Sequence, residues 1–178
     1  MNETPYLTIR EEIEKAEFVL VGIGEEFQAD FKLHTEEELL RAYASLERLI
    51  SGKPYFVVTQ NEDNLIFQSE LLDFFITAPF AKGKPEQNIP EQWNAYLNWL
   101  TATLNHRLCM LELGVGFSAP QVIRFPFERT AAFHLKSRLI RVNETFWQLP
   151  DNIGDRGISI WENAVSILKN DLQSTGGI

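Results

Sequence analysis

Apolar runs without alternating polar positions are the clearest pattern along the chain. Runs of this kind are typical of strands that are buried on both faces, as in a parallel sheet. The three strongest runs are Phe18–Ile23, Tyr55–Val58 and Leu108–Leu113. Two further short strands are expected at Phe74–Thr77 and Arg138–Val142, and Ile158–Leu172 is expected to form a short strand and a closing helix.

Helical patterns lie between these runs. Thr35 and Glu38 form a capping-box sequence, apolar residues then recur at helical spacing, and Gly52 follows in the usual C-terminal position. Helical character is also expected at Glu11–Glu17 and in the Trp-rich segment Glu91–Leu104. The stretch Ala81–Pro90 is rich in Lys, Gly and Pro and is expected to be an exposed loop.

This alternation predicts an α/β fold, a Rossmann-like parallel sheet with helices on both faces. Such sheets bind ligands at the carboxyl ends of their strands. Glycine-rich or polar segments follow four of the expected strands, at 22–24, 59–63, 114–118 and 143–144. We therefore expect a ligand site where these four segments meet.

Length and composition narrow the class of protein. A chain of 178 residues predicts one domain, 1–178, and 44% hydrophobic with 23% charged residues is ordinary for a soluble globular protein. The single cysteine, Cys109, excludes an internal disulfide and a four-cysteine zinc site. No apolar run is long enough for a membrane helix, and the N-terminus lacks the features of a signal peptide. We therefore expect a cytoplasmic protein with no membrane partner.

The net charge of −9 disfavours a nucleic-acid partner. The charge is uneven, because residues 1–50 hold twelve acids and five bases, whereas 121–141 holds five bases and one acid. That basic stretch is interpreted either as solvated helix and strand ends or as a positive wall beside a bound phosphate.

Candidate chemistry lies in the loops rather than in the histidines. His34, His106 and His134 are in no catalytic or metal-binding spacing. Gly22-Ile-Gly24 is not followed by the third small residue of the dinucleotide fingerprint, because Phe27 stands there, and this disfavours a standard dehydrogenase. Thr59–Asp63 holds an amide pair and a carboxylate. These side chains could recognise a carboxamide or ribose hydroxyls, or could hydrogen-bond to their own loop.

Four segments, in this order, resemble those of the sirtuin family: Gly22–Gly24, Thr59–Asp63, Glu112–Pro120 and Ile140–Asn143. Residues 112–128 look most like the bacterial sirtuins of the macrodomain-linked type, and the resemblance covers the chain from about residue 10 onward. Sirtuins bind NAD on a Rossmann-like sheet and transfer its ADP-ribose to an acyl-lysine oxygen or to a protein side chain.

The resemblance implies a set of cofactor-binding residues for NAD or ADP-ribose. They are Gly22, Ile23 and Gly24 at the phosphates, Gln60, Asn61 and Asp63 around nicotinamide and ribose, Gly114, Val115, Gly116 and Ser118 at the phosphates and ribose, and Asn143 and Glu144 at the adenosine ribose. Asp30-Phe-Lys32 resembles the Asp-Phe-Arg of the family's mobile cofactor loop.

The departures from the family pattern bear on activity. Glu25 and Glu26 follow the first motif, and Thr77-Ala-Pro79 stands where the catalytic histidine is expected. The zinc ribbon is missing, and 80–107 holds a loop and the Trp-rich helix in its place, so no zinc is expected.

Two hypotheses follow from this combination. The first is a sirtuin-like protein that binds NAD or ADP-ribose without protein deacylase activity, acting through a protein partner. The second is an NAD-consuming enzyme, for ADP-ribosyl transfer, NAD glycohydrolysis or deacylation, with Asn61 and Asp63 as catalytic residues and His34 as a stand-in base. Trp93, Tyr96 and Trp99 could form a homodimer face, although their spacing favours a position in the core.

Overall fold

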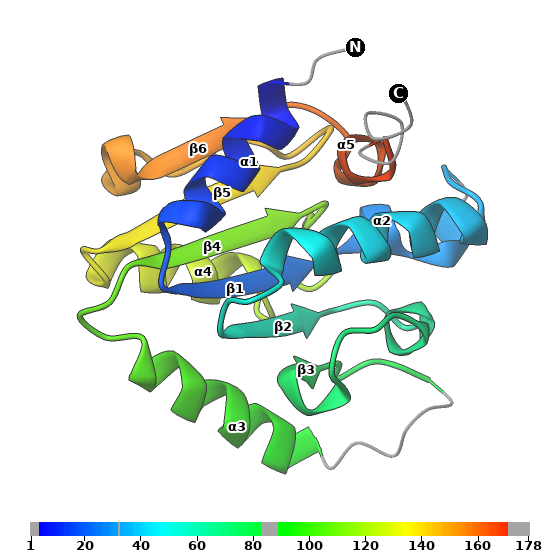
Figure 1. Cartoon of the computed structure of the whole chain (residues 1–178), viewed down its shortest axis with the longest axis horizontal. Coiled ribbons are helices and arrows are strands. Elements are labelled where there is room, and N and C mark those ends of the chain that lie inside the picture. Colours follow the sequence, from blue (N-terminus) through cyan, green and yellow to red (C-terminus); the bar gives the residue numbers. More distant parts are fainter. Residues whose placement is uncertain (1–3, 32, 83–88, 171–178) are drawn as a thin grey trace.

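Six parallel strands form one sheet in the order β3-β2-β1-β4-β5-β6 (Figure 1). The computed structural model describes residues 4–31, 33–82 and 89–170. The strands are β1 (Phe18–Ile23), β2 (Tyr55–Thr59), β3 (Ile76–Thr77), β4 (Leu108–Leu113), β5 (Ser137–Val142) and β6 (Gly157–Ile160). Every adjacent pair is parallel, which confirms the predicted α/β fold.

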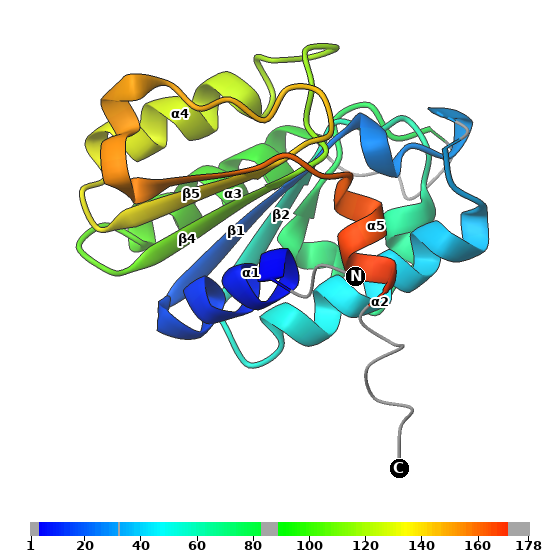
Figure 2. The ribbon, with the colours of Figure 1, turned by 90° about the horizontal axis from the view of Figure 1, so that it is seen from above.

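Helices cover both faces of the sheet (Figure 2). The α-helices are α1 (Thr4–Lys15), α2 (Glu36–Ile50), α3 (Ile89–Ala102), α4 (Arg124–Phe133) and α5 (Ala164–Lys169). Helices α1, α2 and α5 pack on one face, and α3 and α4 pack on the other. Short 3₁₀ turns lie in the connections, at Glu25–Phe27, Ala29–Phe31, Leu65–Gln68, Asp73–Phe75 and Asp151–Arg156.

Burial on both faces explains the unbroken apolar runs. In β1, Val19, Val21 and Ile23 belong to the core beneath α1, α2 and α5, whereas Leu20 belongs to the core beneath α3 and α4. Because successive side chains of a strand point to opposite faces, a strand with both faces covered has no position for a polar residue without a partner.

The local signals at helix ends are confirmed. The Thr35 side chain accepts a hydrogen bond from the Glu38 backbone N–H (3.2 Å), and the Glu38 carboxylate accepts from the Thr35 N–H (2.9 Å). Gly52 has a φ of 80°, as a residue just past a helix end often does. In the Trp-rich helix, Tyr96 is buried and Trp93 and Trp99 pack against the core, which is the core-facing alternative.

Helix α4 lies within a stretch for which the sequence pattern predicts no helix. Its first turn contains Pro126, which a first turn tolerates because its N–H groups have no intrahelical partner. Two further expectations fall partly beyond the described residues: Lys32 of the Asp30-Phe-Lys32 motif and residues 83–88 of the predicted loop are not among them.

The sheet order places a switch point between β1 and β4 (Figure 1). After β1 the chain continues through α2 on one face, and after β4 it continues through α4 on the opposite face. The two connections therefore diverge at the carboxyl edge of the sheet, which is where open α/β sheets bind ligands.

Candidate functional site

The four predicted segments meet at the carboxyl edge through backbone hydrogen bonds. The N–H of Gly24 donates to Leu113, that of Gln60 to Ile23, and that of Gly114 to Val142, at 2.8–3.2 Å. The N–H of Asn143 extends the series by donating to Ile160 (3.2 Å). The structure thus brings the first residues after β1, β2, β4 and β5 side by side.

Close packing between the loops requires glycine at two positions. A Cβ on Gly24 would lie 2.5 Å from the Val115 Cα. Gly114 has a φ of 64°, and a Cβ there would lie 2.4 Å from the Glu26 Cβ. Gly22 instead faces α4, since a Cβ there would lie 2.5 Å from the Ile123 side chain. These three glycines therefore serve contacts within the chain.

The turn at 116–118 holds a carboxylate. The backbone N–H of Gly116 donates to Glu25 Oε2 (2.6 Å), and the N–H of Ser118 donates to Glu25 Oε1 (2.9 Å). Backbone N–H groups that converge on one position form an anion-binding cradle. We call the Gly116 and Ser118 N–H groups, with the Ser118 hydroxyl, the anion cradle, and the occupant of this cradle is the side chain of Glu25.

Buried amide groups lie beside the anion cradle. The Gln60 side chain is 4% exposed, and its Nε2 donates to Ser118 Oγ (2.9 Å), whereas its Oε1 has no hydrogen-bond partner. Asn61 is 1% exposed, and neither polar atom of its side chain has a hydrogen bond, although it approaches the Tyr43 hydroxyl. Burying an amide without partners is costly, so these atoms are available to a ligand.

Asp63 has a different environment from these amides. Its Oδ2 accepts from the N–H of Ala29 (3.0 Å), and its Oδ1 accepts from the N–H of Leu65 (3.0 Å). Its carboxylate therefore joins the loop after β1 to the loop after β2, which is the structural alternative considered for this motif.

Glu26 connects three parts of the edge from a buried position. Its Oε1 accepts from the N–H of Glu144 (2.8 Å), and its Oε2 accepts from the N–H of Ala164, the first residue of α5 (2.7 Å). Burial raises the pKa of Glu26 to about 7, and these two hydrogen bonds oppose that rise.

Asn143 and Glu144 also hold the loops together. Asn143 Nδ2 donates to the Val115 carbonyl (3.1 Å), and its Oδ1 accepts from the N–H groups of Thr145 and Phe146. The Glu144 carbonyl accepts from Trp161 Nε1 (2.8 Å). Trp161 is 70% exposed and stacks with Trp147, so aromatic surface borders this part of the edge.

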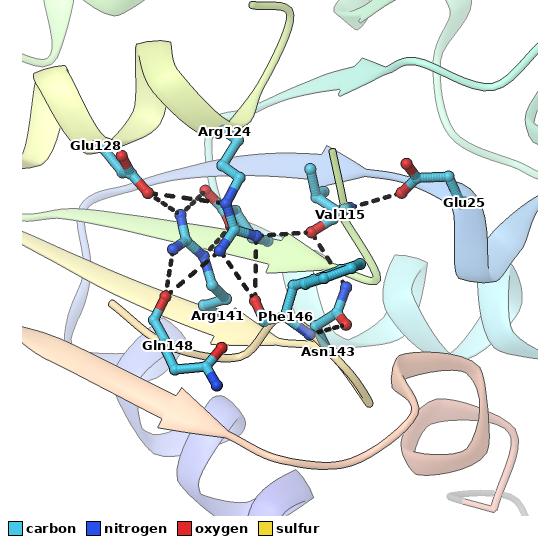
Figure 3. Close-up of polar contacts among 10 residues, drawn as sticks. Glu25, Val115, Arg124, Glu128, Arg141, Asn143, Phe146 and Gln148 are labelled. Carbon is cyan, nitrogen blue, oxygen red and sulfur yellow. Dashed lines mark hydrogen bonds and ion pairs between the residues drawn. The ribbon is translucent and has the colours of Figure 1, made fainter. Parts of the chain in front are cut away.

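An ion-pair network that the sequence pattern does not predict lies beneath the loops (Figure 3). Arg141 of β5 contacts the Glu112 carboxylate through Nε (2.6 Å) and Nη2 (3.1 Å), and both side chains are at most 1% exposed. Arg141 Nη2 also donates to Glu128 of α4 (2.8 Å). Arg124 donates to the carbonyls of Val115 and Phe146 and lies over the Phe117 ring.

This network corrects the interpretation of the basic stretch 121–141. Arg124 and Arg141 are buried and paired. These two residues therefore fit neither interpretation: they are not at solvated helix or strand ends, and they do not form a positive wall beside a phosphate. Arg129 and Lys136 are exposed, as the solvated interpretation expects. Charged residues within otherwise apolar strands, Glu112 in β4 and Arg141 in β5, were the signal that could have revealed the pair.

The hydrogen-bond partners of the three histidines are residues outside the anion cradle and the buried amides. His34 Nε2 contacts Oδ1 of Asn163 (2.9 Å), the N-cap residue of α5. His106 lies beside Glu17, and His134 is buried against Thr103 at the amino end of the sheet. Among the residues that the structure describes, no group of three or more metal-binding side chains is present.

Two further features concern the single cysteine and the length of the helices. Cys109 is buried in β4, and burial raises the pKa of its thiol to about 12, as for an inert core residue. Of the helices in the described ranges, none combines the length and apolar character needed to cross a bilayer.

Comparison with known proteins supports the fold and one short region of sequence. No protein-family model matches the chain. A protein ADP-ribosyltransferase of Staphylococcus aureus (strain Mu50) is 23% identical over 84 residues, which is 47% of this chain and 26% of that relative's length.

A solved structure extends the comparison to nearly the whole chain. The structure of the sirtuin Sir2Tm bound to a propionylated peptide superposes with a TM-score of 0.57 and 12% sequence identity, covering 99% of each chain. The chain therefore has a sirtuin-like, Rossmann-type α/β fold.

Proposed function

We propose that this chain is a sirtuin-like binding protein for NAD or ADP-ribose, without protein deacylase activity. The observation that carries the proposal is the position of buried, unpartnered amides directly beside an anion cradle. Gln60 belongs to both features. Its Nε2 donates to the Ser118 hydroxyl of the anion cradle, and its buried Oε1 has no hydrogen-bond partner.

The chemistry of these groups matches a dinucleotide of this type. Asn61 offers one donor group and one acceptor in a buried position, which suits a carboxamide or a ribose hydroxyl. The N–H groups of Gly116 and Ser118 suit a phosphate oxygen, since they already accommodate a carboxylate. The fold supports this assignment, because ligands of open parallel sheets bind at this edge.

The absence of deacylase activity in this proposal rests on the acid–base groups. A general base must lie within hydrogen-bond reach of the proton that it removes. His34 is engaged with Asn163, and His106 and His134 lie near the opposite end of the sheet. The Asp63 carboxylate accepts two backbone hydrogen bonds, which suits a structural role better than proton transfer.

An NAD-consuming activity remains the second candidate. The observation in its favour is the sequence match to a protein named as an ADP-ribosyltransferase. In this alternative Asn61 and Asp63 would stabilise the positive charge that develops on the ribose, with no histidine required.

The first prediction separates the two candidates with Asn61→Ala. Loss of one or two ligand hydrogen bonds should weaken ADP-ribose and NAD binding about tenfold, since a net hydrogen bond contributes about 1 kcal/mol. The melting temperature should fall by less than loss of a fully hydrogen-bonded buried amide would cause, because the one polar contact described for the Asn61 amide within the chain is its approach to the Tyr43 hydroxyl. Titration calorimetry and thermal unfolding measure the two effects.

Asn98→Ala, an exposed asparagine of α3, is the matched control and should leave binding unchanged. Nicotinamide release from NAD is followed in parallel. Binding without release is the expected result. Release that Asn61→Ala abolishes would instead support the enzyme, and no binding of either ligand at millimolar concentration would overturn both candidates.

A further inference from the structure

The anion cradle already contains a negatively charged group from this chain. Glu25 lies in the 3₁₀ turn directly after β1, and its two carboxylate oxygens accept from two different N–H groups of the loop after β4. Two oxygens of a phosphate group can accept from the same two N–H donors. Figure 3 shows the Glu25 side chain directed toward the segment that begins at Val115.

The cradle favours the ionised form of this side chain. Burial by itself would raise the pKa of Glu25, but the hydrogen bonds from Ser118 and Gly116 outweigh that effect and lower it below its usual range. At neutral pH a second anion in the cradle would therefore meet a full negative charge. Like charges at contact distance inside a protein repel strongly, so the two anions exclude each other.

A second observation indicates that the region is built for a ligand. The buried Gln60 side chain binds Ser118 of the cradle and has an unpartnered Oε1, and Asn61 beside it has two unpartnered polar atoms. Glu25 satisfies the cradle, but it does not satisfy these amides. The part of the site that recognises amide or hydroxyl groups is thus open in hydrogen-bonding terms, while the part that recognises phosphate is filled.

We propose that Glu25 determines the ligand specificity of this site by acting as an internal competitor for phosphate. A ligand that carries phosphate at this position binds only when the Glu25 carboxylate leaves the Gly116 and Ser118 N–H groups. A nucleoside, which carries none, binds without that competition. This inference rests on the proposed function, because it concerns the same site.

The departure of Glu25 is compatible with the surrounding structure. Its carboxylate accepts hydrogen bonds from the 116–118 turn and from its own backbone N–H, whereas the neighbouring Glu26 anchors the loop to Glu144 and Ala164. Glu26 therefore holds the loop after β1 in place when Glu25 moves.

The experiment compares two ligands across three proteins. Titration calorimetry with ADP-ribose and with adenosine is performed on the wild type, Glu25→Gln and Glu25→Ala. Both variants should tighten ADP-ribose binding by about tenfold or more, because they remove the charge that competes with phosphate. Adenosine affinity should change less than about twofold. Inorganic pyrophosphate, as a probe without a nucleoside, should bind to the variants more tightly than to the wild type.

The control removes an equal charge elsewhere. Glu36→Gln changes an exposed residue in the first turn of α2 and should leave the affinities for all three probes unchanged. Thermal unfolding of each variant verifies that it is folded. Glu25→Gln, which keeps the side-chain shape, provides a folded variant should Glu25→Ala loosen the 116–118 turn.

The outcomes separate the inference from the proposed function. ADP-ribose binding that the Glu25 variants leave unchanged or weaken would overturn the inference and leave the proposed function standing. An equal gain for adenosine and ADP-ribose would also overturn it, since that result indicates a loosened loop rather than phosphate competition. Absence of ADP-ribose and NAD binding to the wild type at millimolar concentration would overturn the proposed function itself.

Discussion

Two neighbouring glutamates directly after β1 show how much the pKa of a carboxyl group depends on its surroundings. Glu25 binds a turn after β4, where hydrogen bonds lower its pKa. Glu26 turns to the opposite side and caps α5, in a position that is 6% exposed. Burial, with the nearby charges of Glu144 and Glu25, raises the pKa of Glu26 despite its two backbone hydrogen bonds.

The raised pKa of Glu26 predicts a pH dependence of stability. The pKa of Glu26 rises from 4.5 to about 7 in the folded protein. The folded state therefore binds the Glu26 proton more tightly than the unfolded chain does. The stabilisation that this protonation provides is complete below pH 4.5 and is lost as the pH rises through about 7. Relative to Glu26→Gln, the free energy of unfolding of the wild type should fall by on the order of 3 kcal/mol over this range.

Urea denaturation of both proteins at several pH values between 4.5 and 8 measures this difference. The comparison with Glu26→Gln removes the contribution of carboxylates that lie away from this position. A difference in unfolding free energy that stays constant across the range would contradict the expectation.

At the scale of elements, the pairing of β4 with β5 includes a buried charge pair. Glu112 and Arg141 are register partners, and both point toward α4, where Glu128 adds a second carboxylate. Burial alone would lower the pKa of Arg141, but the hydrogen bonds and charges of Glu112 and Glu128 raise it. Because Arg141 also donates to the Gln148 carbonyl (2.6 Å), the pair fastens the loop after β5 to the sheet.

Breaking this pair should be costly. Arg141→Met leaves the Glu112 carboxylate buried without its partner and should lower the free energy of unfolding by about 3–5 kcal/mol. The double variant Glu112→Leu, Arg141→Met should recover much of that loss, because no buried charge then lacks a partner. Chemical denaturation of Arg141→Met, Glu112→Leu and the double variant measures the coupling between the two residues.

An exposed ion pair provides the comparison. Arg10 and Glu14 in α1 are separated by 3.5 Å, with side chains 51% and 65% exposed, so Arg10→Met should cost no more than about 0.5 kcal/mol. A cost for Arg141→Met as small as that for Arg10→Met would show that the buried network contributes little to stability.

At the scale of the whole molecule, the sheet order gathers the candidate site at one end. The loops after β1, β2, β4 and β5 meet at the carboxyl edge, whereas the turns at 103–107 and 134–137 meet at the amino edge. The unpartnered amides of Gln60 and Asn61 lie on the first of these edges, directly after β2.

This arrangement predicts where a nucleotide perturbs the protein. In a ¹⁵N NMR titration with ADP-ribose, the backbone amides of 60–63, 114–118 and 143–146 should shift, with Gly116 and Ser118 among the most affected because they exchange Glu25 for the ligand. Amides of 103–107 and 134–137 should stay in place and act as the internal control. Shifts concentrated at the amino edge would refute this location.

Most of the fold could be predicted because its signals are local. The strands appear as apolar runs, and the start of α2 appears as a capping box, since each reflects contacts within a few residues. The sequence pattern does not predict helix α4, because its apolar residues do not lie on one face: Phe125 is 49% exposed and Phe133 is 82% exposed, while Phe127 is buried.

The candidate site was predictable as a place more than as a set of contacts. The pattern of strands followed by polar residues indicated the edge where the loops converge. It did not indicate that Asp63 is held by the N–H groups of Ala29 and Leu65, or that the side-chain amide of Asn61 has no hydrogen-bond partner. Such details depend on how far each loop reaches across the sheet.

By itself, then, the sequence determined the parallel α/β architecture, the start of α2 and the edge at which polar loops gather, because periodicity and capping act over short distances along the chain. Only the tertiary structure decided that Glu25 occupies the 116–118 turn and that Glu26 caps α5. Those partners lie 91 and 138 residues away in sequence. They meet because the strand order places β1 beside β4 and because the fold brings the first residue of α5 to the loop after β1.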